Sequence, residues 1–457
     1  MNTEKKSSEK IYADAVTVLP GGVSRNTIFH KPFPHYVSGA SGCMVTDIDG
    51  TQRIDFANNM ASLIHGHAYP PIVEAVTEQL KKGTAYTLAT EVEVRYAQHL
   101  TSRAPDFDKI RFVNSGTEAV MSMVKAARAF TGKSKIAKAE GSYNGTYDFV
   151  EVSQVSSPEN WGPIDHPNRN PLAFGTPPGV LEDVVVYPFN DIENTLNLLD
   201  ENADDLACVL IDPIPHRVGL FAATDAFVEA VYAWTRKHDT LLVFDEVITF
   251  RTTYGGAQQN YSVKPDLTAL GKLIGGGFPV GAFAGRSDVM SVMDPNESPL
   301  RLPHSGTFSA NPITMTAGYV AMQDFDQNAI LDLNELTARA ISQINEAIKL
   351  ADVPMSISGL GSMFRLHPRR NAPESYREAF QFKEEKAVMT KILDHMFYKE
   401  NIIMVNTGTC MFSTAIGQQE VDRLSQGLMN AFKANKAELN EVWDRYHEKH
   451  KKADPKG

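Results

Sequence analysis

Apolar residues in the middle of the chain form short unbroken runs that are separated by segments with helical spacing. Runs without polar alternation indicate strands that are buried on both faces, and intervening helices indicate parallel pairing. The pattern therefore predicts an α/β domain with a mostly parallel sheet covered by helices on both sides. The expected strands are 109–113, 135–139, 184–187, 206–211, 241–244, 266–270 and 280–284, and the expected helices include 116–130, 192–200 and 226–238.

The two ends of the chain follow different patterns. Turn signals between residues 36 and 56 separate short alternating segments, which predicts a small antiparallel meander. From about residue 329, helices alternate with a few short strands, which is typical of an α+β domain. Further helices are expected at 9–19, 71–81, 91–103 and from 312 towards 328, and further strands at 364–366 and 411–415.

These patterns divide the chain into three parts. We expect residues 1–70 to form an N-terminal segment with the meander, residues 71–328 a large α/β domain, and residues 329–457 a C-terminal α+β domain. The segment 152–179 is rich in Pro, Asn and Gly and lacks periodicity. A long irregular excursion of this kind is either a functional lid or a loose surface loop, and the sequence leaves both interpretations open.

The composition narrows the class of protein. A chain of 457 residues exceeds the roughly 250–300 residues that one core supports, so more than one domain is expected. The net charge of −11 argues against nucleic-acid or membrane partners. The cysteines lie far apart without metal-ligand spacing, which favours reduced thiols in a cytoplasmic protein. No signal peptide or membrane-spanning stretch is expected.

One lysine stands out for its apolar surroundings. Lys272 lies in the segment ALGKLIGGG, between Leu and Ile residues and before three glycines. Loss of hydration favours the neutral amine, which is a nucleophile suited to forming a Schiff base with a carbonyl. The alternative is a strand-end lysine that extends to water beside a flexible turn.

Two further motifs carry chemistry. The turn Ser115-Gly116-Thr117 lies between a strand and a helix, where free N–H groups can hold a phosphate, although a plain helix cap is an alternative. Asp245 and Glu246 end another strand and should face opposite sides of the sheet. One of them could keep a heterocyclic nitrogen protonated, and a metal ligand or a cap are alternatives. A phosphate site, an acid and a desolvated lysine together suit a pyridoxal phosphate enzyme.

The motifs NSGTEA, LLVFDEV, ALGKLIGGGFPVGAFAGR and SGTFSANP together resemble class III (subgroup II) aminotransferases, in the branch of glutamate-1-semialdehyde 2,1-aminomutases and β-amino-acid aminotransferases. The resemblance extends from about Leu19 into the C-terminal part. It implies the α/β fold of fold-type I pyridoxal phosphate-dependent transferases. In that fold, a mostly parallel seven-stranded sheet forms the large, cofactor-binding domain, and both termini contribute to a smaller α+β domain.

The resemblance also implies roles for individual residues in binding pyridoxal 5'-phosphate. Tyr143 would stack on the ring, in a segment where the family usually has His at the position of Asn144. Thr307 would reach the phosphate in the neighbouring subunit, which implies a homodimer with shared active sites. The other implied roles are phosphate binding by Ser115, Gly116 and Thr117, pairing of Asp245 with the ring nitrogen, packing of Val247 on the ring, and the Schiff base at Lys272.

The substrate is expected to depend on positions where this chain departs from the aminomutases. Arg25 resembles the arginine with which β-amino-acid aminotransferases bind the substrate carboxylate, which suits a guanidinium; the alternative is an exposed cation. Met60 replaces a tryptophan of the pocket wall. His216 and Arg217 follow the strand end at Asp212, and we expect them at the surface; the alternative is that one of them faces the site.

We therefore expect an aminotransferase that moves an amino group from a β-amino acid, or a similar carboxylate-bearing amine, to a 2-oxo acid. The first alternative is a glutamate-1-semialdehyde 2,1-aminomutase, which needs no acceptor, and a racemase or epimerase is a third. Alternatives of other classes are a catalytically inactive binding protein, which predicts loss of Lys272 or Asp245, and a nucleotide-binding oxidoreductase, which predicts a GxGxxG motif that the chain lacks.

Overall fold

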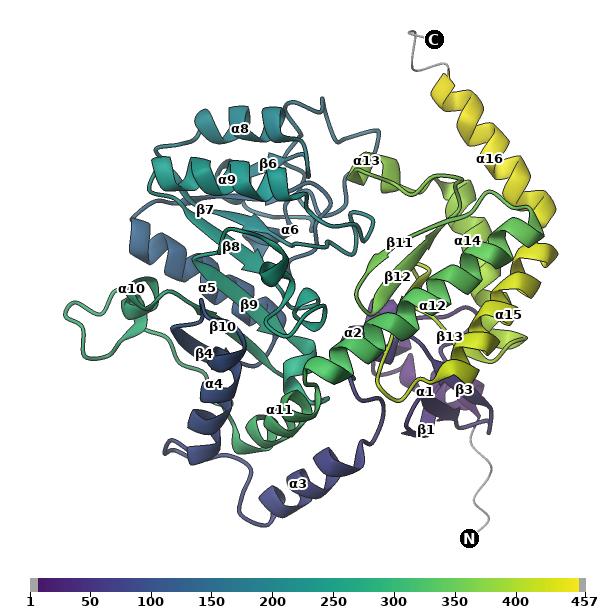
Figure 1. The fold of residues 1–457 in the computed structure, drawn as a ribbon, viewed down its shortest axis with the longest axis horizontal. Helices are drawn as coiled ribbons and strands as arrows, with labels where there is room; N and C mark the ends of the chain where they lie inside the picture. The colour runs from purple at the N-terminus through teal and green to yellow at the C-terminus, as the bar shows by residue number, and fades with distance from the viewer. Residues whose placement is uncertain (1–6, 452–457) are drawn as a thin grey trace.

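The structure is a computed structural model that describes residues 7–451. The first six residues of the expected segment 1–70 and the last six of the expected domain 329–457 lie outside the described part. Figure 1 shows the large sheet with its helices on one side of the molecule and the elements from both chain ends gathered on the other. No helix in the described part is long and apolar enough to cross a membrane.

The large sheet has seven strands in the order β4-β10-β9-β8-β7-β5-β6. Its strands are parallel except for β10, which is antiparallel to both neighbours. The predicted mostly parallel seven-stranded sheet is confirmed. The strands are β4 (Lys109–Val113), β5 (Lys135–Ala139), β6 (Val184–Tyr187), β7 (Leu206–Ile211), β8 (Leu241–Asp245), β9 (Leu267–Gly271) and β10 (Gly281–Gly285).

Helices cover both faces of this sheet. Alternate residues of β8 show the division: Leu241 and Val243 pack in the core formed with α5 (Gly116–Thr131), whereas Leu242 and Phe244 pack with α9 (Asp225–Lys237). This two-sided burial explains the absence of polar alternation in the strands. The other helices of this region are α3 (Pro70–Leu80), α4 (Glu91–Arg103), α6 (Asp148–Glu151), α7 (Pro178–Glu182), α8 (Ile192–Asp200), α10 (Ser287–Met290) and α11 (Pro312–Asp324).

The smaller part combines both ends of the chain. The predicted meander is present as β1 (Val37–Ser41), β2 (Met44–Asp47) and β3 (Gln52–Asp55), and β13 (Ile402–Ile403) extends it by parallel pairing with β3. A second sheet has the order β11-β12-β14. It consists of β11 (Ser356–Leu360), β12 (Met363–His367) and β14 (Thr409–Met411), beside α1 (Ser8–Ala15), α2 (Asn58–Ala61), α12 (Gln327–Ala351), α13 (Tyr376–Ala379), α14 (Lys383–Tyr398), α15 (Gln418–Ala434) and α16 (Lys436–Lys451).

Several elements differ from their predicted bounds by about one residue, and three differ by more. The helix expected at 9–19 is α1, which ends at Ala15. The long helix expected from 312 to 328 ends at Asp324, because Phe325 leaves helical geometry and Asp326 caps α12. The strand expected at 411–415 is β14, which ends at Met411, because the next residues turn to other partners: the Thr414 N–H donates to the Ile64 carbonyl. The proposed domain boundaries stay a prediction.

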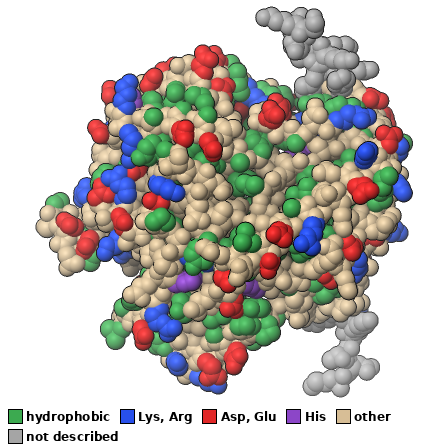
Figure 2. All heavy atoms as spheres, viewed as in Figure 1, with side chains coloured by type: hydrophobic (Ala, Val, Ile, Leu, Met, Phe, Trp, Pro, Cys, Tyr) green, Lys and Arg blue, Asp and Glu red, His purple; other side chains and the backbone are tan. Residues whose placement is uncertain are grey.

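On the face shown in Figure 2, acidic and basic side chains are interspersed over both parts of the molecule. The net negative charge of the chain therefore does not gather into a single acidic surface on this face.

Candidate active site

A cavity of about 560 Å³ opens at the carboxyl ends of the parallel strands, and its size is typical of a small-molecule site. Parallel strands of an α/β sheet deliver their following loops to this edge. Most of the sequence-predicted site residues line the cavity, although they come from distant parts of the chain. These residues are Arg25, Ser115, Gly116, Thr117, Tyr143, Asp245, Val247 and Lys272.

Lys272 follows β9 at the start of a 3-10 turn and lines the cavity. Its neighbours Leu270, Leu273 and Ile274 are fully buried, so the Lys272 amine is surrounded in the sequence by buried apolar side chains. Burial lowers the pKa of Lys272, and the negative charges of Asp245 and Asp212 act in the opposite direction. The lysine therefore combines access to the cavity with a shift towards the neutral, nucleophilic amine.

Asp245 points into the cavity because it continues the strand face of Leu241 and Val243, which is the face that α5 covers. The Asn144 side-chain amide donates to its carboxylate at 2.9 Å, and the Val247 N–H donates at 3.1 Å. Burial raises the pKa of Asp245, while these two hydrogen bonds and the Lys272 charge oppose that rise. Within the described residues Asp245 forms no ion pair, so a cationic ring nitrogen would offset the cost of burying this carboxylate.

Glu246 points to the other face of the sheet, as predicted, and has a different role. Its carboxylate accepts hydrogen bonds from the backbone N–H groups of Ala257 and Gln258 and from the hydroxyl of Thr249. Burial raises the pKa of Glu246 to about 7. Glu246 therefore holds the loop after β8 in place and takes no part in the cavity.

The turn at 115–117 joins β4 to α5 and caps the helix, and it lines the cavity. The Ser115 hydroxyl accepts a hydrogen bond from the Glu118 N–H at 3.1 Å, which confirms the capping interpretation. The backbone N–H groups of Gly116 and Thr117 are at the start of α5, where they have no carbonyl partner within the helix. They are therefore available to donate to a ligand. A Cβ at position 116 would lie 2.8 Å from Cγ1 of Val247, so only glycine fits between the helix end and this side chain.

Tyr143 and Asn144 follow β5, whose carboxyl end adjoins that of β7. Tyr143 lines the cavity and is 39% exposed there. The guanidinium carbon of Arg217 lies 5.3 Å from the centre of the Tyr143 ring. Arg217 is exposed, as expected, and it does not line the cavity. Its contact with Tyr143 arises because the loops after neighbouring parallel strands meet at one edge of the sheet.

His216, unlike Arg217, differs from its expected surface position. It is partly buried, and its Nε2 lies 3.1 Å from the hydroxyls of both Thr407 and Thr409. Burial lowers its pKa to about 3, with Arg365 adding to the shift. The side chain therefore joins the end of β7 to the C-terminal sheet as a neutral group.

Met60 is not among the residues that line the cavity, where Asn59 and Ser62 are found instead. The reason is the backbone of α2, in which Asn59 and Met60 both have left-handed dihedral angles. Such a conformation costs roughly 1–2 kcal/mol per residue. The hydrophobic periodicity of the sequence, which predicts ordinary strands and helices, does not predict it. The turn changes which side chains of this segment face the cavity.

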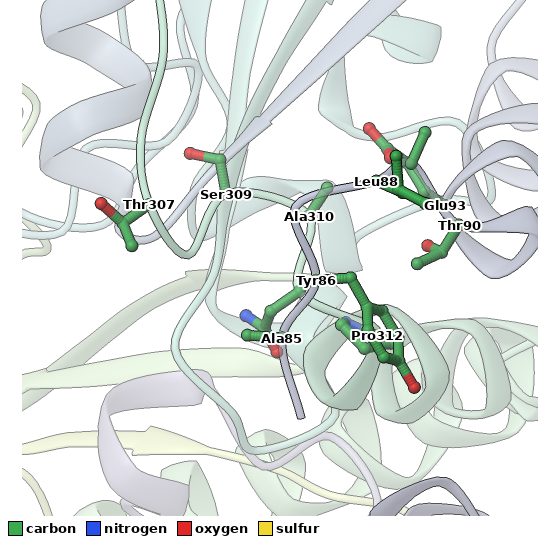
Figure 3. Close-up of a pocket in the computed structure, with 11 residues that line it drawn as sticks. Ala85, Tyr86, Leu88, Thr90, Glu93, Thr307, Ser309, Ala310 and Pro312 are labelled. Atoms are coloured by element: carbon green, nitrogen blue, oxygen red, sulfur yellow. The ribbon is translucent and has the colours of Figure 1, made fainter. Parts of the chain in front are cut away.

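Thr307 lies outside the main cavity and lines a second hollow of about 170 Å³. Figure 3 shows this hollow between the segment that carries Tyr86 and Leu88, before α4, and the segment 307–312, which leads into α11. Thr307 therefore does not line the cavity that contains residues 115–117 of its own chain.

The excursion at 152–179 is tied down at several points. The hydroxyl of Ser153 donates to the Asn168 carbonyl at 2.6 Å, and the hydroxyl of Tyr376 in α13 donates to the Ser156 carbonyl at 2.6 Å. Arg377 donates to the Gly162 carbonyl at 2.9 Å and pairs with Glu140. The loose-loop interpretation therefore does not fit residues 153–170, whose two ends bond to each other, and the lid stays a prediction.

The cavity residues fit pyridoxal phosphate in each of its parts. The start of α5 offers N–H groups for a phosphate, Asp245 offers a buried carboxylate for a protonated ring nitrogen, and Lys272 offers an amine. Two buried acceptors beside Tyr143, the Ser142 hydroxyl oxygen and the Asn144 amide oxygen, have no partner within the described residues. Polar groups of this kind are expected to bond to a ligand or water.

Comparison with known proteins agrees with this geometry. The sequence matches the aminotransferase class-III family over residues 28–381. It is 35% identical over 414 residues to a glutamate-1-semialdehyde 2,1-aminomutase of Methanothermobacter thermautotrophicus, covering 90% of this chain and 95% of that protein.

Two solved structures extend the comparison. An omega-transaminase from Sphaerobacter thermophilus is 42% identical with a TM-score of 0.91, over 94% of this chain and 98% of the other. A β-phenylalanine aminotransferase from Variovorax paradoxus is 29% identical with a TM-score of 0.84, over 94% of each chain. The chain therefore belongs to the class III aminotransferases, a family of pyridoxal phosphate-dependent enzymes.

Proposed function

We propose that this enzyme transfers an amino group from a β-amino acid, or a similar amine with a carboxylate, to a 2-oxo acid. The observation that carries the proposal is the position of Arg25, which lines the same cavity as Lys272. Within the described residues its guanidinium forms no ion pair, and its one hydrogen bond goes to the neutral side chain of Asn59, at 2.8 Å. A guanidinium with free donors beside a reactive amine suits a substrate carboxylate.

The relatives support two versions of this chemistry. The structural likeness to a β-phenylalanine aminotransferase favours transfer from a β-amino acid to a separate acceptor. The identity to proteins named as glutamate-1-semialdehyde 2,1-aminomutases favours the second candidate, in which the amino group moves within one molecule. Both candidates place a carboxylate in the cavity, and they differ in the need for a 2-oxo acid.

The mechanism assigns two tasks to Lys272 and one to each of the other side chains. Pyridoxal phosphate, when bound, supplies an aldehyde that amines attack and a protonated ring that accepts electrons. Lys272 is the attachment residue, and its neutral amine then takes the proton from the substrate carbon that bears the nitrogen. Asp245 holds the proton on the ring nitrogen, and Asn144 orients the Asp245 carboxylate. Arg25 binds the substrate carboxylate and so presents the amino group to the reacting centre.

Replacing Arg25 with alanine is expected to raise KM for 3-aminobutanoate about 10- to 100-fold, because a hydrogen bond to a charged group contributes roughly 1.5–3 kcal/mol. KM for 1-phenylethylamine, which has no carboxylate, should change little. Steady-state rates with a 2-oxo acid acceptor measure both values. An equal loss with both amines would contradict the assignment of Arg25.

The same assays separate the two candidates. Ketone formed only in the presence of a 2-oxo acid supports the aminotransferase. Conversion of glutamate-1-semialdehyde to 5-aminolevulinate without any acceptor, and no turnover of β-amino acids, would overturn the proposal in favour of the aminomutase.

We also propose an active homodimer in which Thr307 completes the phosphate site of the partner subunit. Thr307 is exposed, and the next residue, Phe308, is 60% exposed. Leu88, which lines the hollow of Figure 3 away from Thr307, is 83% exposed, so apolar surface is open there. Exposed apolar surface of this kind is typical of an interface.

Sedimentation of the holoenzyme is expected to give twice the chain mass of 50.4 kDa. Replacing Leu88 with glutamate should weaken the dimer and loosen the cofactor together, because each phosphate site would lose a neighbour's hydroxyl. A monomer that retains the cofactor as tightly as the wild type would contradict this arrangement.

A further inference from the structure

We propose that Asn59 is a positioning residue that aims the Arg25 guanidinium at the substrate carboxylate, and that a left-handed turn exists to place it there. The inference rests on the proposed function of Arg25 and deepens it by naming what determines carboxylate specificity. Asn59 lines the cavity together with Arg25, although 34 positions separate them in the sequence.

The turn has an unusual backbone. The four consecutive residues from Asn58 to Ala61 have φ values of 44°, 46°, 57° and 72°. Residues other than glycine avoid this left-handed region of positive φ, and among them asparagine tolerates it best. A stretch of four is retained only where the surrounding structure imposes it, and such strain is concentrated at binding sites.

Buried polar groups impose this conformation. One carboxylate oxygen of Asp55 accepts hydrogen bonds from the N–H groups of Ala57 and Asn58, at 2.8 and 2.9 Å. The other oxygen lies 2.8 Å from Nε2 of His67. The side chain of Asn58, which is fully buried, donates to the Met411 carbonyl at 2.6 Å. The turn is therefore anchored to both the meander and the C-terminal sheet.

The turn presents Asn59 with its amide already oriented. The side-chain amide nitrogen of Asn59 donates to the Ser62 hydroxyl at 3.0 Å. That hydroxyl in turn donates to the backbone carbonyl of Asn59 at 3.0 Å. The amide oxygen is consequently left to accept from Nη1 of Arg25 at 2.8 Å. A flipped amide would place its NH₂ group against the guanidinium and lose both contacts.

The hydrogen-bond partner of Arg25 is neutral, whereas a carboxylate partner would neutralise the guanidinium charge. The Asn59 oxygen occupies one of the five guanidinium donors and leaves the positive charge uncompensated. The remaining donors can bind a substrate carboxylate in the bidentate arrangement. Because Arg25 is otherwise exposed, this bond also reduces the side-chain freedom that carboxylate binding would have to remove.

The test is calorimetric titration of the holoenzyme with 3-phenylpropanoate, which carries a carboxylate but no amine. In N59G the Kd is expected to rise about 3- to 10-fold, the value of one modest hydrogen bond. Glycine is chosen because it keeps the left-handed backbone accessible, so the thermal midpoint should equal or exceed that of the wild type. In N59D the Kd should rise further, because the new carboxylate competes for the guanidinium.

Steady-state kinetics give a second measurement. In N59G the KM for 3-aminobutanoate should rise with the Kd while kcat changes much less, and 1-phenylethylamine should be unaffected. The matched control is N401G, which relieves a left-handed asparagine (φ 55°) before β13, outside the residues that line the cavity. This control should leave the Kd for 3-phenylpropanoate at the wild-type value.

The results for R25A and N59G together distinguish failure of the positioning role of Asn59 from failure of the proposed role of Arg25. If R25A weakens 3-phenylpropanoate binding and N59G does not, the positioning role is overturned and the role of Arg25 stands. If R25A leaves binding unchanged, the carboxylate site itself is overturned. If N59G weakens carboxylate and non-carboxylate ligands equally, Asn59 has only a structural role and the inference fails.

Discussion

Replacing Lys272 with alanine is expected to lower kcat/KM by at least about 10⁴-fold, because the variant loses both the covalent attachment point and the general base. The position of Lys272 in the cavity, among fully buried apolar neighbours, explains why its amine can perform both tasks. The purified variant should also lack the yellow absorption of the wild-type holoenzyme. Single-turnover rates with 3-aminobutanoate and absorption spectra measure the two effects.

The control for this experiment is Lys81, whose exposed side chain pairs with Glu78 on the surface of the molecule. Lys81→Ala should keep the rate and the colour of the wild type. Borohydride treatment followed by peptide mass spectrometry should find the cofactor fixed to Lys272 in the wild type and in the control. Cofactor fixed to another lysine, or normal turnover by the alanine variant, would refute the assignment.

Replacing Asp245 with asparagine is expected to lower kcat about 10²- to 10⁴-fold. An amide has nearly the shape of the carboxylate but no negative charge, so it cannot hold the proton on the ring nitrogen. The change should also remove the buried negative charge that opposes the lowering of the Lys272 pKa, so that pKa should fall further. Stopped-flow rates and a spectral pH titration of the holoenzyme measure these effects.

Glu246 provides a matched control, since it is the adjacent buried carboxylate on the opposite face. Glu246→Gln should keep kcat close to the wild type but lower the free energy of unfolding by about 1–3 kcal/mol, because an amide cannot accept all the N–H and hydroxyl donors that the carboxylate does. If the two substitutions produced the same loss of kcat, the separate roles of the two carboxylates would be wrong.

Local patterns in the sequence were sufficient to predict the sheet and most of the residues that line the cavity. The strands β6, β7 and β8 could be located because burial on both faces requires unbroken apolar runs. The opposite directions of Asp245 and Glu246 follow from the alternation of a strand, so their separate roles could also be predicted. The turn at 115–117 was recognisable because a strand end and a helix start lie side by side in the sequence.

The surroundings of the substrate depend on contacts that no local pattern contains. Arg217 reaches Tyr143 only because β7 pairs with β5 in the sheet. Thr307 belongs to a different hollow from the rest of the predicted site, which depends on how α4 and α11 pack. The break between α11 and α12 depends on a cap that periodicity does not reveal.

The sequence alone therefore determined the fold and indicated the roles proposed for Lys272 and Asp245, because strand periodicity, apolar runs and short motifs act over a few neighbouring residues. Only the tertiary structure decided that Asn59, and not Met60, faces the cavity and holds Arg25. The physical reason is that a left-handed turn is unfavourable by itself. It persists because Asn58 bonds to the carbonyl of Met411, a residue 353 positions away.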